Sequence, residues 1–448
     1  MNKKTSEEEK EMSVVFYSSI ARSFRTTLVG YFYEVCQKYP VVLLSEELDP
    51  ETDKIIRDKK LFPKLKVIIP VNQLNKNSAT IAGAFSLNKY ARNLAREIIK
   101  KYKPDIVIAP GSYFFESYLR RFAKKEGAVT ISGIGSILIK NKKEYRNSRI
   151  ILTAGRNYLF LPLFFRIFMA RIKKYLGHFV YYWVFPALIG QAPFINHESS
   201  VLVWEDYSRT KGADYYSVYS EEDKNYIAKE GGDPEKLLVL RHPFAGKSRD
   251  FLLRNFFQEP SAPQKKFTIV EEAVATNTGN MGSPIVSSEE RERQKIKIVK
   301  NIAKKLSGWE ILIKPHPMDN AVPGKFQKMI ENFQPISKSV KVLNPLEPAD
   351  KYINISQAMA VYSPCTTIFT TSFLSPKKPI FFIDYPQKSF AKDYKNSSKV
   401  EYIDSEEKLN EALEGIKNGT YKRVEGKKLK CEGFSGMLEL IDFVLSKK

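Results

Sequence analysis

The chain has 448 residues, of which 43% are hydrophobic, so it is long enough to form two hydrophobic cores and we expect two domains. Its three cysteines, Cys36, Cys365 and Cys431, have neither paired nor metal-type spacing, which argues against a disulfide framework and a zinc site. The first twelve residues are charged and polar and lack the apolar run of a secretory signal, so we expect a cytoplasmic protein.

The net charge of +22 requires a polyanionic partner, and nucleic acid, anionic lipid and a phosphorylated substrate are the three candidates. The positive charge is concentrated. Residues 140–175 contain ten lysines and arginines against the single acid Glu144, a local excess of nine charges.

The first part of the chain alternates short apolar runs with helical patterns. Strands are expected at 13–17, 40–44, 66–69, 105–109, 200–204, 215–218 and 237–240. Helices are expected up to about 38, at 85–102, at 111–125 and at 220–231. This alternation predicts βαβ units and a parallel sheet. We assign residues 1–245 to a first Rossmann-like domain and residues 246–266, which contain Pro260 and Pro263, to a linker.

The same alternation resumes in a second Rossmann-like domain, residues 267–448. Strands are expected at 267–270, 311–314, 340–343, 358–362 and 379–384, and helices at 288–306 and 349–355. The last segment, 433–448, is an amphipathic helix that we expect to pack back across the domain boundary.

Within the first domain, an insertion at about 155–195 has the pattern of a helix lying in a membrane interface. Apolar and aromatic residues occupy one face of the helix that follows Pro162, and cations occupy the other. The residues expected to contact the membrane are Phe164, Arg166, Phe168, Arg171, Lys173, Lys174 and Trp183. The alternative is an internal helical hairpin that covers the sheet.

A transmembrane helix is disfavoured. The uncharged stretch 175–197 has an apolar part of about sixteen residues, interrupted by Gly177 and Pro186, whereas roughly twenty residues are needed to cross a bilayer. We therefore expect peripheral binding to an anionic membrane surface, on the inner face of the cell membrane.

One candidate binding site lies at the end of the expected strand 311–314, which runs into Lys314-Pro315-His316-Pro317. In an open parallel sheet, ligands bind outside the carboxyl ends of the strands, so Lys314 and His316 are expected at the ligand crevice. Another strand of the same sheet leads into the hydroxyl residues Ser363, Thr366 and Thr367 at a predicted helix N-terminus, which is a favourable site for an anion. Ordinary helix capping is the alternative for the hydroxyls. The two elements together favour a phosphate-bearing ligand.

The order of these motifs resembles the nucleotide-binding half of GT-B glycosyltransferases. Leu-Ile-Lys-Pro-His-Pro is followed by a strand, by Ser-Pro-Cys-Thr-Thr and by Lys-Pro-Ile-Phe-Phe-Ile-Asp. The nearest likeness is to bacterial surface-polysaccharide transferases with a His-Pro motif: polysialyltransferases, Kdo transferases and CDP-glycerol glycerophosphotransferases. The passage 215–243 also resembles the end of a GT-B N-terminal domain, so the resemblance covers roughly residues 200–385.

The resemblance implies two Rossmann-like domains that face each other across a cleft, with the donor on the second and the acceptor on the first. It places His316 on the donor phosphate, and Ser363, Thr366 and Thr367 on phosphate or ribose. It also implies a general base in an acidic-acidic-Gly motif. Glu205-Asp206 matches the two acids, but Tyr207 stands where the motif has glycine.

Proton removal from an acceptor hydroxyl requires a carboxylate or an imidazole. Glu205 and Asp206 are the first candidates, and Glu116 is the reserve; solvated or capping carboxylates are the alternative for each. His242, before Pro243, is a hinge residue or a second phosphate contact.

We predict a metal-independent, inverting glycosyltransferase without cofactor that moves a sugar from a nucleotide donor to a lipid-linked or polymeric surface glycan such as a capsule polysaccharide. No Asp-x-Asp motif and no histidine pair supports a metal site. A CDP-polyol phosphotransferase of the teichoic-acid type and a nucleotide-sugar epimerase are the alternatives. A nucleic-acid-binding protein is suggested by the charge alone and is disfavoured because the aromatic residues form one block and no recognition motif is present.

Overall fold

The computed structural model describes fourteen segments of the chain. They are residues 11–18, 24–45, 48–71, 81–110, 114–133, 212–229, 232–256, 264–271, 288–316, 324–347, 349–362, 378–385, 400–421 and 433–447. The chain forms two compact units. The described residues up to 256, together with 433–447, belong to the first unit, and those from 264 to 421 belong to the second.

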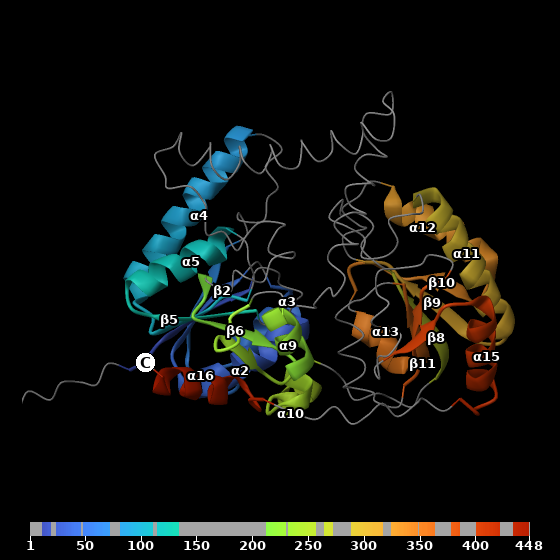
Figure 1. Ribbon diagram of the computed structural model, residues 1–448. Coiled ribbons are helices and arrows are strands. Elements are labelled where there is room, and N and C mark those ends of the chain that lie inside the picture. The colour runs from blue at the N-terminus through green and yellow to red at the C-terminus, as the bar shows by residue number, and fades with distance from the viewer. Residues whose placement is uncertain are drawn as a thin grey trace, which may run out of the picture. The chain divides into compact units, whose positions relative to one another are not determined.

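In the described residues of the first unit, seven strands form a parallel sheet (Figure 1). Its strands are β1 (Val14–Ser18), β2 (Val41–Ser45), β3 (Leu65–Pro70), β4 (Ile106–Ile108), β5 (Val129–Ser132), β6 (Tyr215–Val218) and β7 (Leu237–Val239). The strand order is β3-β2-β1-β4-β5-β6-β7, so β1 pairs with β2 on one side and with β4 on the other. The direction of the strand order therefore reverses between β1 and β4. Central strands such as β1 and β2 are buried along their whole length, as continuous apolar runs in parallel sheets usually are.

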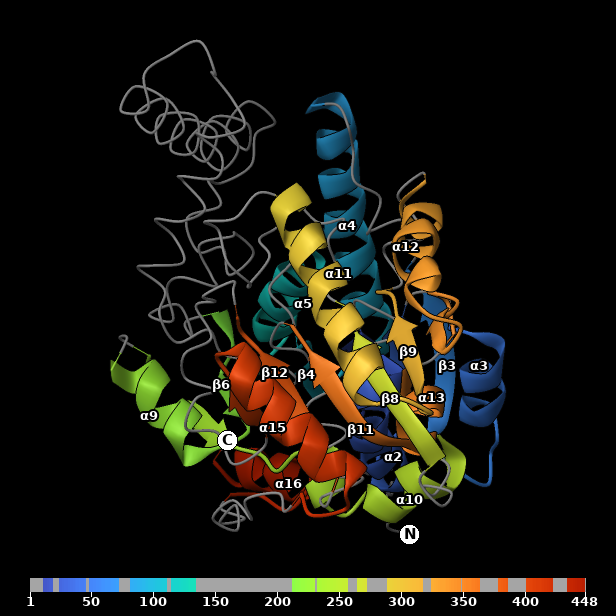
Figure 2. The ribbon, with the colours of Figure 1, turned by 90° about the vertical axis from the view of Figure 1, so that its right-hand side faces the viewer.

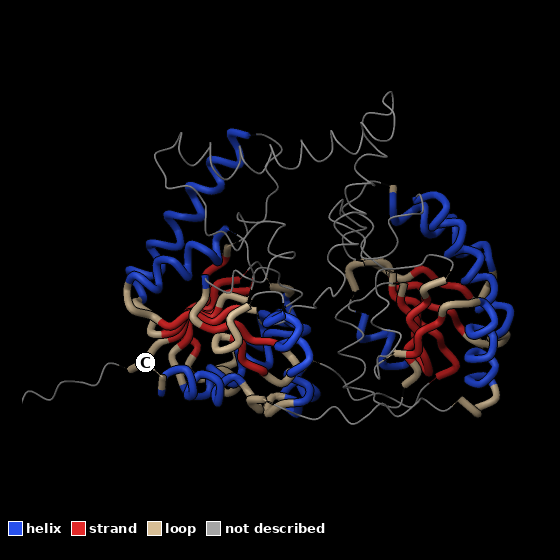
Figure 3. The backbone as a smooth tube through the Cα atoms, in the orientation of Figure 1, coloured by secondary structure: helices blue, strands red, loops and turns tan. Residues whose placement is uncertain are grey.

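Helices pack on both faces of this sheet (Figure 3). They are α2 (Val29–Lys38), which continues a π-helical turn at Phe24–Leu28, α3 (Pro50–Ile56), α4 (Ile81–Tyr102), α5 (Phe114–Lys125), α9 (Glu221–Lys229), α10 (Arg249–Asn255) and α16 (Met437–Ser446). Local sequence explains several of their ends. For example, Asp49 caps α3 by accepting from the Thr52 N–H at 2.9 Å, and Pro50 occupies its first turn.

The part of the second unit that the structure describes forms a six-stranded parallel sheet. Its strands are β8 (Gln264–Val270), β9 (Glu310–Lys314), β10 (Val340–Val342), β11 (Ser356–Val361), β12 (Ile380–Ile383) and β13 (Glu401–Ile403). The order is β10-β9-β8-β11-β12-β13, which reverses between β8 and β11. The helices are α11 (Ser288–Lys305), α12 (Lys325–Phe333), α13 (Ala349–Ile355) and α15 (Glu406–Lys417). Two Rossmann-like domains, as the sequence predicts, are confirmed.

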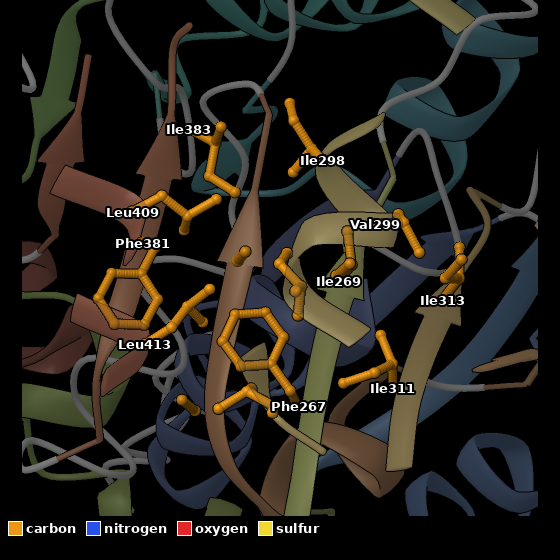
Figure 4. Close-up of a cluster of buried hydrophobic side chains, with 14 of the residues drawn as sticks. Phe267, Ile269, Ile298, Val299, Ile311, Ile313, Phe381, Ile383, Leu409 and Leu413 are labelled. Carbon is orange, nitrogen blue, oxygen red and sulfur yellow. The ribbon is translucent and has the colours of Figure 1, made fainter. Parts of the chain in front are cut away.

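The core of the second unit forms because alternate strand residues face opposite layers of helices. On one face, Phe267 and Ile313 pack with α11 and α15, and Figure 4 shows Ile298 of α11 and Leu413 of α15 among them. The two helices lie side by side over the sheet (Figure 2). On the other face, Met359 and its neighbours pack against α13.

The C-terminal helix α16 belongs to the first unit, in agreement with the expectation that it packs back across the domain boundary. It packs against α2, beside which it is visible in Figure 1. The buried Glu34 carboxylate of α2 accepts a hydrogen bond from the Met437 N–H at 2.6 Å. Burial raises the pKa of Glu34, and hydrogen bonds from Ser248 and the backbone of Met437 act in the opposite direction.

A short stretch of backbone joins the segment before α16 to the edge of the first sheet. The Phe434 N–H donates to the Val239 carbonyl at 2.9 Å, and the Arg241 N–H donates to the Phe434 carbonyl at 3.0 Å. Gly433 has a φ of +87°, and a Cβ at this position would lie 2.3 Å from the Val239 carbonyl oxygen. The close approach therefore requires glycine.

The structure differs from the predicted segment boundaries at two places. Residues 249–255, assigned to the linker, form helix α10, because Phe251 and Leu252 are buried and Phe251 stacks on Tyr33 at 3.8 Å between ring centroids. Residues 433–447, assigned to the second domain, lie in the first unit. Among the described residues, four helices and two strands were not predicted: α3, α10, α12, α15, β5 and β13.

The predicted insertion at 155–195, with all seven expected membrane residues, lies outside the described residues. Among the helices that the structure describes, none is both long enough and apolar enough to cross a membrane.

The close contact at Gly433 predicts that Gly433→Ala destabilises the first unit more than Gly127→Ala does. Gly127 also has a positive φ, of +80°, but a Cβ there would meet no atom within 4 Å. The control change should cost only the left-handed backbone strain of about 1–2 kcal/mol, whereas Gly433→Ala adds a collision with β7. Urea unfolding of the full chain measures both. Equal unfolding midpoints for the two variants would show that the segment before α16 is not held in this way.

Candidate functional site

The carboxyl edge of the second sheet carries buried polar residues at the ends of four neighbouring strands. Glu271 follows β8, Lys314 ends β9, Tyr362 follows β11 and Asp384 follows β12, and each is at most 6% exposed. The strand order reverses between β8 and β11, and in open parallel sheets ligands bind at such a point. This edge is therefore the candidate site of the second unit.

Lys314 is 2% exposed, and its ammonium group donates to two backbone carbonyls. The acceptors are Pro315, at 2.8 Å, and Pro345, at 2.9 Å. The ammonium thus joins the corner after β9 to the turn after β10. Its role as a donor-phosphate contact stays a prediction; what the structure shows is a cation that shapes the corner in which His316 lies.

His316 is the second residue beyond β9 and is partly exposed. Its position at the carboxyl edge of the sheet is the one that the Lys-Pro-His-Pro sequence predicts. The other predicted donor contacts, Ser363, Thr366 and Thr367, lie outside the described residues. Tyr362, which is described, immediately precedes Ser363 in the chain.

A buried ion pair lies at the same edge and was not predicted. The ammonium of Lys295, in α11, pairs with the Glu271 carboxylate, and both side chains are at most 3% exposed. The Lys295 ammonium also lies 5.1 Å from the centre of the Tyr362 ring. The sequence contains no signal for this pair, because Lys295 is one of several charges in a strongly charged helix and Glu271 follows an ordinary strand.

Two further polar side chains make hydrogen bonds near β12, on the other side of the reversal from β8 and β9. The Tyr402 hydroxyl donates to the Asp384 carboxylate. Lys378 donates to the carbonyls of Ile353 and Asn354 at the end of α13, and burial lowers the pKa of its ammonium to about 8. Lysine at a helix C-terminus complements the partial negative charge of the free carbonyls.

In the first unit, α5 places two buried charged residues near the carboxyl ends of β4 and β5. Glu116, in the first turn, is 0% exposed, and Arg120, one turn later, is 1% exposed. The Arg120 guanidinium donates to the Ala109 carbonyl at 2.8 Å and to the Ser132 hydroxyl at 3.3 Å. Glu116, the reserve candidate for the base, therefore lies on the helix that follows β4, beside the reversal of strand order.

Three predicted site residues of the first domain remain. Glu205 and Asp206 lie outside the described residues. His242 is 6% exposed in the first unit, and its Nδ1 accepts from the Phe244 N–H at 3.4 Å. The ring also packs against Tyr219, with 5.0 Å between centroids. These contacts make His242 the residue that shapes the turn after β7.

The described parts of the chain contain no group of three or more His, Cys, Asp or Glu residues that could hold a metal ion. Metal independence therefore stays a prediction that an assay must test.

No protein-family model matches the sequence, and no curated protein matches it significantly. Solved structures match over almost the whole chain. The UDP-GlcNAc 2-epimerase from Methanocaldococcus jannaschii is 14% identical, with a TM-score of 0.55, over 98% of this chain and 100% of that one.

A second epimerase and one transferase give similar values. The UDP-GlcNAc 2-epimerase from Neisseria meningitidis bound to UDP-GlcNAc is 12% identical, with a TM-score of 0.53, over 98% of this chain and 100% of that one. The glycotransferase of kitacinnamycin is 11% identical, with a TM-score of 0.52, over 98% of this chain and 99% of that one. At these identities the likeness shows the fold, and the fold is GT-B.

The two carbonyl contacts of Lys314 predict that Lys314→Met destabilises the second unit by roughly 2–4 kcal/mol, because two buried acceptors lose their donor. The control is Lys341→Met in the neighbouring strand, whose ion pair with Glu310 is exposed and should contribute at most about 1 kcal/mol. Thermal unfolding measures both. A Lys314→Met protein as stable as the control would contradict the anchoring role.

Proposed function

We propose that this chain is a GT-B glycosyltransferase that uses a nucleotide-activated sugar as donor. The observation that carries the proposal is the position of His316, partly exposed at the carboxyl edge of the second sheet, beyond a corner that a buried ammonium fixes. The UDP-GlcNAc 2-epimerases among the structures of the same fold support a donor of this class.

In the proposed reaction, His316 donates a hydrogen bond to the donor diphosphate and stabilises the charge that develops as the nucleotide leaves. The hydroxyls of Ser363, Thr366 and Thr367 hold phosphate or ribose. Lys314 keeps the β9 corner in place. A carboxylate of the first domain removes the acceptor proton, with Glu205, Asp206 and Glu116 as the candidates. The reaction proceeds with inversion and needs no metal ion.

A nucleotide-sugar epimerase is the second candidate, because two of the structures described above are UDP-GlcNAc 2-epimerases. An epimerase converts the nucleotide sugar without an acceptor, whereas a transferase of either type needs one. Incubation of the chain with UDP-GlcNAc alone, followed by NMR, distinguishes the two. A CDP-linked polyol donor would place the chain with the teichoic-acid type of phosphotransferase.

Thermal unfolding with CMP, CDP, UDP and GDP tests the donor site. One nucleotide at 100 times its dissociation constant should stabilise the wild type by about 2.7 kcal/mol, a shift of several degrees, and EDTA should not abolish the shift. His316→Ala should lose most of the shift, while Lys341→Met, which changes an exposed side chain of β10, should keep it. Absence of a shift with all four nucleotides would overturn the proposal.

We also propose that the acceptor is a lipid-linked or polymeric surface glycan and that the chain binds the inner face of the membrane peripherally. The support is the amphipathic pattern and local charge of the insertion. A variant lacking residues 158–190 should fail to sediment with vesicles that contain anionic lipid, and the wild type should be released by salt. An equally bound deletion variant would contradict the membrane role of the insertion, and a soluble variant with full nucleotide-sugar activity would favour the epimerase.

A further inference from the structure

Lys295 contacts the ends of both strands at which the order of the second sheet reverses. Its ammonium pairs with the carboxylate of Glu271, the residue after β8, and lies 5.1 Å from the ring centre of Tyr362, the residue after β11. The two strands are hydrogen-bonded neighbours in parallel register, Val361 opposite Val270. One side chain of α11 therefore fixes the two strand ends that border the candidate site.

All three side chains are shielded from water, so the interactions between them are stronger than they would be at the surface. As whole residues, Glu271 is 4% exposed, and Lys295 and Tyr362 are each 1% exposed. Removing two charges from water is expensive, so a buried ion pair is often no more stabilising than apolar residues of the same size. The pair is therefore not expected to make the protein much more stable than two apolar residues at the same positions would. What the pair does provide is a fixed geometry, because an uncompensated charge is costly in any other arrangement.

The pair itself carries no net charge, so it does not offer a phosphate an uncompensated positive charge. Its effect on a ligand must therefore pass through the strand ends that it joins. At one of these, the Glu271 N–H donates to the Lys314 carbonyl at 2.9 Å, in the strand that leads to His316. An ammonium group over an aromatic face is attracted to the ring, most strongly where water is excluded. The attraction restrains the ring of Tyr362 and, through it, the end of β11.

We propose that Glu271, Lys295 and Tyr362 form a positioning triad for the donor-nucleotide site, a role that rests on the proposed function and extends it to residues that touch no substrate. The triad holds the ends of β8 and β11 and, through the pairing of β8 with β9, the corner that leads to His316, in the one arrangement that the nucleotide meets. Preorganisation of this kind appears as tighter binding, because less conformational freedom is lost when the ligand binds.

The test separates positioning from stability. Glu271→Gln alone leaves the Lys295 ammonium buried without its carboxylate and should destabilise the protein. The double variant Glu271→Gln with Lys295→Met removes both charges and should recover much of that stability. Its affinity should not recover, because Tyr362 no longer faces a cation. We expect its Kd for the nucleotide that stabilises the wild type to be roughly three- to thirtyfold weaker by calorimetry.

Two further variants isolate the ring. Tyr362→Phe keeps the aromatic face and should bind the nucleotide within about twofold of the wild type, whereas Tyr362→Leu removes the face and should weaken binding as the double variant does. The matched control is Lys305→Met with Glu414→Gln, which removes an exposed ion pair, 2.7 Å between Nζ and Oε1, that joins α11 to α15. This control should bind within about twofold of the wild type.

The possible results differ in what they overturn. If the wild type binds a nucleotide and both the double variant and Tyr362→Leu bind it equally well, the triad has no positioning role, although the proposed function stands. If affinity recovers together with stability in the double variant, the pair is only structural and the proposal is overturned. If the wild type binds none of the four nucleotides, the proposed function fails, and the triad's role fails with it.

Discussion

Burying an ammonium group is costly unless the protein supplies partners, and the described residues at the carboxyl edge of the second sheet include two such groups. Lys314 is satisfied by two backbone carbonyls, and Lys295 by a carboxylate and an aromatic face. Both lie at the carboxyl edge, where the strands end and the connecting segments diverge. Because each lysine fixes parts of the chain that are distant in sequence, the shape of this edge depends on charge as much as on hydrophobic packing.

The sequence predicts the elements of the fold well where apolar runs are short and bounded. Strands β1, β2, β9 and β12 lie within a residue or two of their predicted positions, because a buried parallel strand is a nearly continuous apolar run between turn residues. Strand β5, Val-Thr-Ile-Ser, and strand β13, Glu-Tyr-Ile, were not predicted, since each is short and mixes polar with apolar residues. Helix α10 was not predicted, because the prolines that follow it led us to assign its residues to a linker.

The candidate site shows a similar division. His316 could be placed from sequence because the prolines around it mark the end of a strand, and the ends of parallel strands share one edge. The partners of Lys314 could not, since a carbonyl of Pro345 approaches it only through the pairing of β9 with β10. The Glu271 and Lys295 pair was equally beyond sequence reasoning, because two charges 24 residues apart have no mutual pattern. Pairing of this kind is a property of the tertiary structure.

The return of the last helix to the first unit has a consequence for synthesis on the ribosome. Domains usually fold in the order in which they emerge, the N-terminal one first. Here the N-terminal unit is completed only by residues 433–447, which are translated after every strand of the second sheet. Until then the face of α2 that receives α16 and the edge of β7 that pairs with Phe434 are uncovered, so the nascent first unit has an exposed apolar surface that a chaperone can bind.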